Sequence, residues 1–137
     1  INGFLGRLCV SGEIYDLDDD QWAIVDRGIA FYKECTPVIR DGRSRRYGDE
    51  NLDYNHLKGW QAVVREGKKD AEGLCLAVIH RFAGNDGEEL SVPLPAGDWK
   101  IRGQYGENEI RAEIKDGKLE LNGMGEFAAV AILLEKQ

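Results

Sequence analysis

The sequence predicts a mainly β fold: an antiparallel β-sandwich of about seven or eight strands, preceded by one α-helix. Two observations predict it. Residues 18–36 repeat their apolar side chains with the period of a helix, whereas the chain from Trp60 onward alternates with period two between Gly- and Asp-rich turns. The 137 residues are 42% hydrophobic and 31% charged, a composition typical of a globular unit and unlike that of a disordered segment.

The expected helix begins at a capping motif. Asp18 precedes Gln21 by three residues, the spacing of a capping box that satisfies free amide groups of the first turn. The acidic run that starts at Asp16 also alternates like an EF-hand calcium loop. However, Gln21 stands where that loop needs glycine, and Arg27 stands where it needs a bidentate glutamate. We therefore predict helix capping here and no metal site.

The helix carries two apolar stripes, one of Trp22, Val25, Ile29 and Tyr32 and a second of Ile24, Gly28, Phe31 and Cys35. Together they cover more of the circumference than a helix resting on one partner needs. We expect packing on two sides, with Trp22 in the core. Pro37 is expected to end the helix, because it cannot continue the hydrogen-bond ladder.

Seven later segments have the length and boundaries of strands: residues 61–65, 74–82, 90–94, 99–105, 109–115, 118–122 and 127–134. Residues 74–82 are apolar on both faces, which predicts a central strand, and residues 109–115 have one charged face, which predicts contact with solvent. Asp116-Gly117 predicts a two-residue hairpin.

Residues 41–59 are polar and contain glycine, so we expect a connecting loop there. Its basic cluster of Arg43, Arg45 and Arg46 is interpreted as a solvated part of that loop.

Charge and cysteine content limit the classes of function. A net charge of -7 argues against nucleic acid or an anionic membrane as the main partner. Cys9, Cys35 and Cys75 are odd in number and widely spaced, which favours reduced thiols and a cytoplasmic location. The chain starts at Ile1 rather than Met, so we expect that its true N-terminus lies upstream.

No pattern predicts a catalytic or substrate-binding residue, and none implies a cofactor. A Gly-x-Ser-x-Gly elbow is absent from the sequence, and two histidines without a Cys-x-x-Cys pair do not predict a zinc site. Trp60 and Trp99 each open an expected strand, where packing at the sandwich edge is the ordinary interpretation. Stacking of either ring on a sugar is the alternative, and it would make the chain a carbohydrate-binding module.

The sequence resembles the C-terminal part of α-galactosidases (melibiases) of glycoside hydrolase family 36. The residues that carry the resemblance are Phe4 to Leu17, Gln21-Trp22, Phe31-Tyr32-Lys33, Val38-Ile39-Arg40-Asp41-Gly42 and Leu94-Pro95-Ala96-Gly97-Asp98-Trp99. The first four resemble the end of the catalytic barrel in those enzymes. The last resembles a "Leu-Pro-x-Gly-x-Trp" turn in their C-terminal sandwich.

The resemblance implies three parts. Residues 1–40 would be the end of a (β/α)8 barrel, with its last strand and loop at 4–12 and its last helix at 18–36. Residues 41–59 would connect it to a C-terminal β-sandwich at 60–137.

The family's two catalytic aspartates lie upstream of this point, so the resemblance implies no catalytic residue in this chain. It implies an accessory domain that stabilises the barrel of a parent enzyme, a retaining hydrolase of terminal α-galactosides that uses a carboxylate pair. The barrel is therefore the expected partner. We expect an isolated chain to cover its second helical stripe against another copy of itself.

Overall fold

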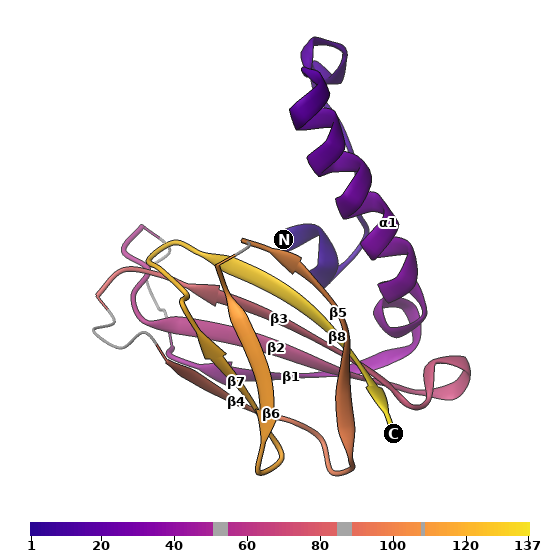
Figure 1. Ribbon diagram of the computed structural model, residues 1–137, viewed down its shortest axis with the longest axis vertical. Helices are drawn as coiled ribbons and strands as arrows, with labels where there is room; N and C mark the ends of the chain where they lie inside the picture. The colour runs from indigo at the N-terminus through magenta and orange to yellow at the C-terminus, as the bar shows by residue number, and fades with distance from the viewer. Residues whose placement is uncertain (51–54, 85–88, 108) are drawn as a thin grey trace.

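The computed structural model describes residues 1–50, 55–84, 89–107 and 109–137, and it confirms the antiparallel β-sandwich preceded by a helix (Figure 1). A five-stranded sheet runs in the order β1 (Gly42–Gly48), β2 (Trp60–Gly67), β3 (Leu74–Arg81), β8 (Ala129–Lys136) and β5 (Trp99–Gly106). The second sheet runs in the order β4 (Leu90–Pro93), β7 (Lys118–Asn122) and β6 (Arg111–Lys115). Helix α1 spans Asp19–Asp41, and three 3-10 turns are η1 (Asn2–Leu5), η2 (Ile14–Asp16) and η3 (Lys69–Ala71).

Two apolar layers hold these elements together. The inner layer lies between the two sheets and includes Leu119, Leu121 and Ile132, none of which is exposed. The outer layer lies between the five-stranded sheet and the helical elements α1 and η1, and there Leu76 and Leu133 are buried. Strand β3 contributes to both layers, which confirms the central strand expected from its two apolar faces.

The seven expected strands form, each within two residues of its predicted bounds. Strand β6 keeps Ala112 and Ile114 against the core and its charged side chains in solvent, as predicted. At the hairpin between β6 and β7, Asp116 and Gly117 both have positive φ, 50° and 74°, the combination that a type I′ turn requires.

Helix α1 begins as the sequence predicts but ends later. The amide of Gln21 donates to Asp18 Oδ1 at 2.8 Å, and the amide of Asp18 donates to Gln21 Oε1 at 3.0 Å, so the capping box forms. The end expected at Pro37 is wrong, because Pro37 lies inside the helix. Val38, just beyond it, is completely buried on the sheet. Burial in this last turn offsets the cost of a helical proline, about 3 kcal/mol.

The loop expected at 41–59 contains a strand that the sequence did not reveal. Strand β1 pairs antiparallel with β2 along its whole length. Only Tyr47 of this strand packs against the inner core, and the four residues from Arg43 to Arg46 are exposed. An edge strand with a single apolar anchor lacks the alternation that identifies strands in a sequence. The basic cluster is therefore solvated, but it lies on an edge strand.

The barrel strand expected at residues 4–12 does not form. Residues 2–5 form η1, and residues 6–11 have no regular structure. Phe4 is buried and its ring lies 5.5 Å from that of Phe31 on α1. A lone segment without a neighbouring strand cannot satisfy its backbone by strand pairing, so the apolar side chains pack on the helix instead.

Candidate interaction surface

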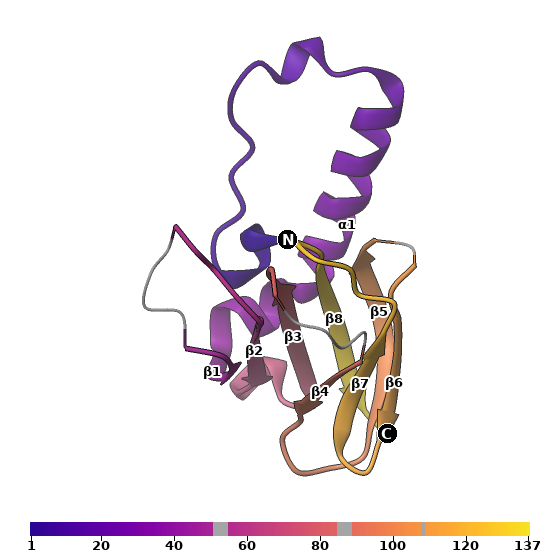
Figure 2. The same ribbon diagram turned by 90° about the vertical axis from the view of Figure 1, so that its left-hand side faces the viewer.

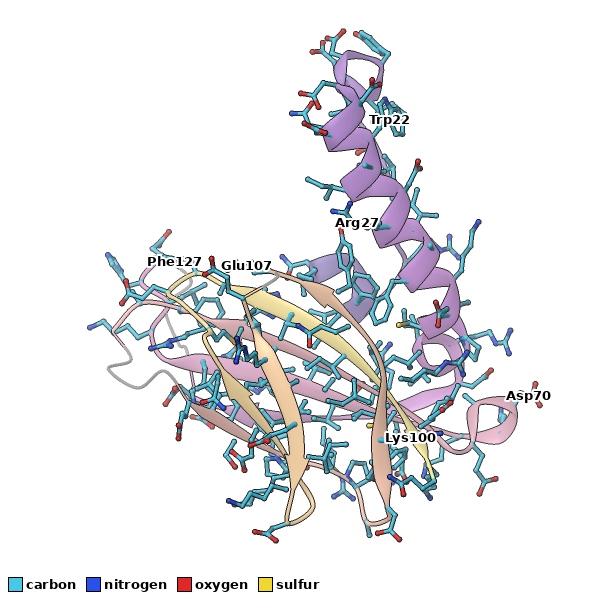
Figure 3. The ribbon with its side chains drawn as sticks, viewed as in Figure 1. Trp22, Arg27, Asp70, Lys100, Glu107 and Phe127 are labelled. Carbon is cyan, nitrogen blue, oxygen red and sulfur yellow. The ribbon has the colours of Figure 1, made fainter. Side chains whose placement is uncertain are left out.

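Helix α1 lies on the sheet with its C-terminal half and extends beyond the sheet with its N-terminal half (Figures 1 and 2). Cys35 and Val38 in the C-terminal half are fully buried. Trp22 lies near the free end (Figure 3), where its side chain is half-exposed and belongs to neither core layer. The expectation that Trp22 is a core residue is therefore wrong, because the helix passes the edge of the sheet before reaching it.

The stripe that begins at Ile24 faces the sheet, and two glycines allow a close approach there. A Cβ at Gly28 would lie 2.9 Å from the Tyr105 hydroxyl, and a Cβ at Gly103 would lie 2.9 Å from the Phe31 ring. The Tyr105 ring stacks on that of Phe31 at 6.2 Å, and its hydroxyl donates to the Ile24 carbonyl at 3.0 Å. The close contact fixes α1 to the end of β5.

The other stripe is covered in part by the chain's own first residues, which we call the arm (residues 6–13). The Tyr32 hydroxyl donates to the Gly6 carbonyl at 2.9 Å and accepts from the Leu8 amide at 3.2 Å. Arg65 of β2 donates to the carbonyls of Leu5 and Ile39, both at 3.0 Å. The two bonds to Tyr32 hold the start of the arm against α1, and Figure 2 shows the arm rising from there to the free end of the helix.

Three of the four large hydrophobic side chains that the described residues expose lie in or beside the projecting half of α1, and the fourth, Phe127, lies on the sandwich across a cleft from it (Figure 3). The four are Val10 (46% exposed) in the arm, Tyr15 (75%) in η2, Ile24 (51%) on α1 and Phe127 (72%) just before β8. We call these four residues, with Trp22, the helix-end surface. Exposed hydrophobic side chains that lie together mark binding surfaces in soluble proteins, and here Ile24 and Phe127 line one cleft.

Two clefts flank the projecting helix. One, of about 330 Å³, lies between α1 and the arm and is lined by Leu8, Val10 and Ile29 among others. The second, of about 790 Å³, separates α1 from the sheet, and Phe127 lines it across from Arg27 (Figure 3). Phe127 has a φ of 58°, a conformation that costs about 1–3 kcal/mol for a bulky residue.

The polar residues next to the helix-end surface are acidic. Asp18, Asp19 and Asp20 are exposed at the start of α1, where negative charge stabilises the helix dipole. Exposed apolar side chains next to charged ones are typical of protein interfaces.

The two tryptophans considered for sugar stacking differ in exposure. Trp99 is only 5% exposed, its Nε1 donates to the Pro95 carbonyl at 2.8 Å, and the Lys136 ammonium lies 5.3 Å from its ring. Its ring therefore closes the Leu94–Trp99 turn and has no free face for a sugar. Trp60 is half-buried and packs against the inner core. The carbohydrate alternative therefore depends on Trp60.

The cysteines are free thiols, and their surroundings differ. Burial raises the pKa of Cys35 and of Cys75 to about 12 each, with smaller contributions from the negative charges of Glu34 and Glu66 respectively. Cys9, in the arm, is exposed.

Across the described ranges, no group of three or more His, Cys, Asp or Glu side chains is arranged to hold a metal ion. The helices in those ranges all lack the length and apolar composition of a membrane span.

Comparisons with protein-family models, with curated proteins and with solved structures found no match to this chain. The resemblance to α-galactosidases therefore rests on the sequence motifs. Where the structure describes these motifs, their residues have structural roles: Tyr32 holds the arm, Gly42 ends α1, and Trp99 closes a turn.

The exposed residues of the helix-end surface were not identified from the sequence. The two apolar stripes of the helix did indicate a second partner for α1. They did not indicate that the arm covers part of this apolar surface.

Proposed function

We propose that this chain is the C-terminal accessory β-domain of an α-galactosidase-like glycoside hydrolase. It stabilises the catalytic barrel of its parent and does not itself react with substrate. The motifs from Phe4 to Gly42 and from Leu94 to Trp99 support the family. The helix-end surface supports the role, because it is an apolar surface at one end of the molecule that a larger partner would bury.

The exposed hydrophobic side chains on the two sides of the cleft between α1 and the sheet are the observation that carries this proposal. Full burial of a large apolar side chain contributes about 1.5–3 kcal/mol. Ile24 and Phe127 lie on the two sides of one cleft, so a single partner surface would cover both. Covering them would stabilise the partner and the accessory domain together.

The proposed chemistry of the parent requires a pair of carboxylates about 5–5.5 Å apart, one acting as nucleophile and the other as acid and base. In this proposal both carboxylates belong to the upstream barrel. We therefore expect the isolated chain to release no phenol from an aryl α-galactoside. Turnover that a single Asp or Glu substitution within residues 1–137 abolishes would refute the accessory role.

Site-specific crosslinking in the full-length gene product tests the docking. The proposal requires a reading frame that continues upstream of Ile1 with a barrel of about 300 residues. A photoreactive phenylalanine analogue in place of Ile24 should then crosslink to that barrel. The same analogue in place of Lys115, in the hairpin at the opposite end of the molecule, is the matched control and should not crosslink (Figure 1). Equal crosslinking from both positions, or none from Ile24, would contradict the proposal.

A further inference from the structure

Strand β1 is an edge strand with an unusual charge. Within the described residues it pairs with β2 on one side and with no strand on the other (Figure 1). Arg43, Arg45 and Arg46 lie in its exposed stretch, although the chain as a whole carries a net charge of -7. None of the ion pairs among the described residues includes any of the three arginines. The edge therefore combines open backbone groups with local positive charge.

Two hydrogen bonds show which backbone groups point outward. At one end of the strand the amide of Asp49 donates to the Trp60 carbonyl at 2.8 Å, and at the other the amide of Lys68 donates to the Asp41 carbonyl at 3.0 Å. Bonded and non-bonded pairs alternate along an antiparallel ladder. The odd-numbered residues of β1 therefore face β2, and the even-numbered residues direct their N–H and C=O groups to the open edge.

The side chains carry charge on both faces of this edge. Arg46 lies opposite Val63, on the face of the sheet that α1 covers in part, whereas Arg45 lies opposite the buried Val64, on the sandwich face. Ser44 and Arg46 are the central residues whose backbone groups point outward. A strand that bonded to them would have a guanidinium next to it on either face.

We propose that the open edge of β1 binds an extended acidic peptide segment by strand addition. The outward N–H and C=O groups of Ser44 and Arg46 supply the backbone hydrogen bonds, and the three arginines pair with carboxylates of the added strand. Seven residues from Gly42 to Gly48 span about 23 Å, which accommodates a segment of about six or seven residues.

The same arginines disfavour pairing of β1 with β1 of a second copy of the chain. Two β1 strands paired antiparallel would bring arginine against arginine, and like charges opposite one another destabilise a sheet. Charged edge strands commonly prevent such self-pairing. Here the charge has a single sign, so it rejects another β1 and attracts a strand of opposite charge.

Binding of a synthetic peptide tests the proposal. The probe is a capped eight-residue peptide, Val-Glu-Glu-Val-Val-Glu-Glu-Val, whose neighbouring glutamates point to opposite faces of a strand, and the control peptide has Lys in place of every Glu. Calorimetry should show saturable binding of the Glu peptide that weakens as salt is added, and no binding of the Lys peptide. Deuterium exchange at the amides of Ser44 and Arg46 should slow in the complex.

Two variants with the same change in net charge test whether binding depends on the charge at the β1 edge or on the net charge of the chain. Reversing two charges on the edge, with Arg45→Glu and Arg46→Glu, should weaken binding about tenfold or more. The control reverses two exposed charges on β6, an edge strand of the other sheet, with Arg111→Glu and Lys115→Glu, and should leave binding within about twofold. Equal losses in the two variants would overturn the proposal.

Two N-methylated versions of the Glu peptide test the backbone pairing. One is methylated at the amides of its odd-numbered residues and the other at those of its even-numbered residues. Because one edge of the added strand faces β1, methylation of one set should abolish binding and methylation of the other should leave it. The proposal is overturned if neither peptide loses affinity, if the parent peptide does not bind, or if an oligothymidine of equal charge binds as tightly.

Discussion

Single residues determine where the sandwich turns. At the β6–β7 hairpin, Asp116 and Gly117 both occupy the left-handed region, which glycine adopts freely and aspartate tolerates. A Cβ at Gly117 would meet no other atom within 4 Å, so only backbone conformation selects glycine there.

Replacement of Gly117 by Val should therefore lower the free energy of unfolding by about 1 kcal/mol or more, because a β-branched residue resists positive φ. Chemical denaturation measures the change. Asp116→Asn is the matched control and should have little effect, since asparagine also tolerates this conformation. If both variants were as stable as the wild type, the turn would not have this geometry.

His80 gives the fold a dependence on pH. Burial, and next the positive charge of the Ile1 amino group, lower its pKa from the ordinary value near 6.5. The unfolded chain then takes up the proton at a higher pH than the folded chain does. The contribution of His80 to stability is thus complete above about pH 6.5 and declines as the pH falls below that value.

We predict that the difference in unfolding free energy between wild type and His80→Gln changes as the pH is lowered from 7.5 to 5, with the wild type losing more stability. Ala23→Gln, an exposed change on α1 that adds and removes no titratable group, is the control and should follow the wild-type profile. Parallel profiles for wild type and His80→Gln would exclude this effect.

Thiol reactivity should divide the cysteines into two classes. Cys9 is exposed, whereas Cys35 and Cys75 are buried with pKa values of about 12, so few thiolates form in the folded chain. A neutral-pH assay with Ellman's reagent should titrate one thiol quickly and the other two only in denaturant. Cys9→Ser should remove the fast phase, and a fast phase that survives this change would contradict the burial of the others.

At the scale of elements, burial overrides local preference in helix α1. The helix continues through Pro37 because the turn beyond it buries Val38 on the sheet. The Thr36 hydroxyl donates to the Tyr32 carbonyl at 2.9 Å, within the turn that precedes the proline. A proline inside a helix lowers the free energy of unfolding by about 3 kcal/mol relative to alanine. The same proline also restricts the unfolded chain, which offsets about 0.4–1 kcal/mol of that loss.

Pro37→Ala should therefore stabilise the chain by about 2 kcal/mol, measurable as a higher midpoint of thermal or chemical unfolding. Pro95→Ala is the opposing control. Pro95 lies in a turn, where loss of stiffness should leave stability unchanged or slightly lower. A destabilising effect of Pro37→Ala would show that the proline has a role that this account lacks.

What the sequence predicts about these elements depends on how locally each signal acts. The capping box and the Asp116-Gly117 turn are local, so the start of α1 and the hairpin are predicted correctly. Strand β1 owes its existence to pairing with β2, and the continuation of α1 past Pro37 depends on distant strands. Such tertiary effects leave little trace in a short window of sequence. The same reason explains why the exposed members of the helix-end surface were not identified in advance.

At the scale of the whole molecule, the sandwich and the projecting helix differ in how completely they are covered. The sandwich has two buried apolar layers. The projecting half of α1 has the arm on one side and an open cleft on the other, with Ile24 and Phe127 exposed along it. An accessory domain separated from its barrel would expose such a surface. In solution we expect this surface to bind a second copy of the chain.

Light scattering of the isolated chain shows whether a second copy covers the helix-end surface. We predict an apparent mass that rises above 15.3 kDa as the concentration enters the high micromolar range. Ile24→Asp should return the chain to the monomer mass, whereas Ala23→Asp, one position along the same helix, should leave the association unchanged. A wild-type chain that stays strictly monomeric over this range would contradict the account, because the helix-end surface would then need no partner.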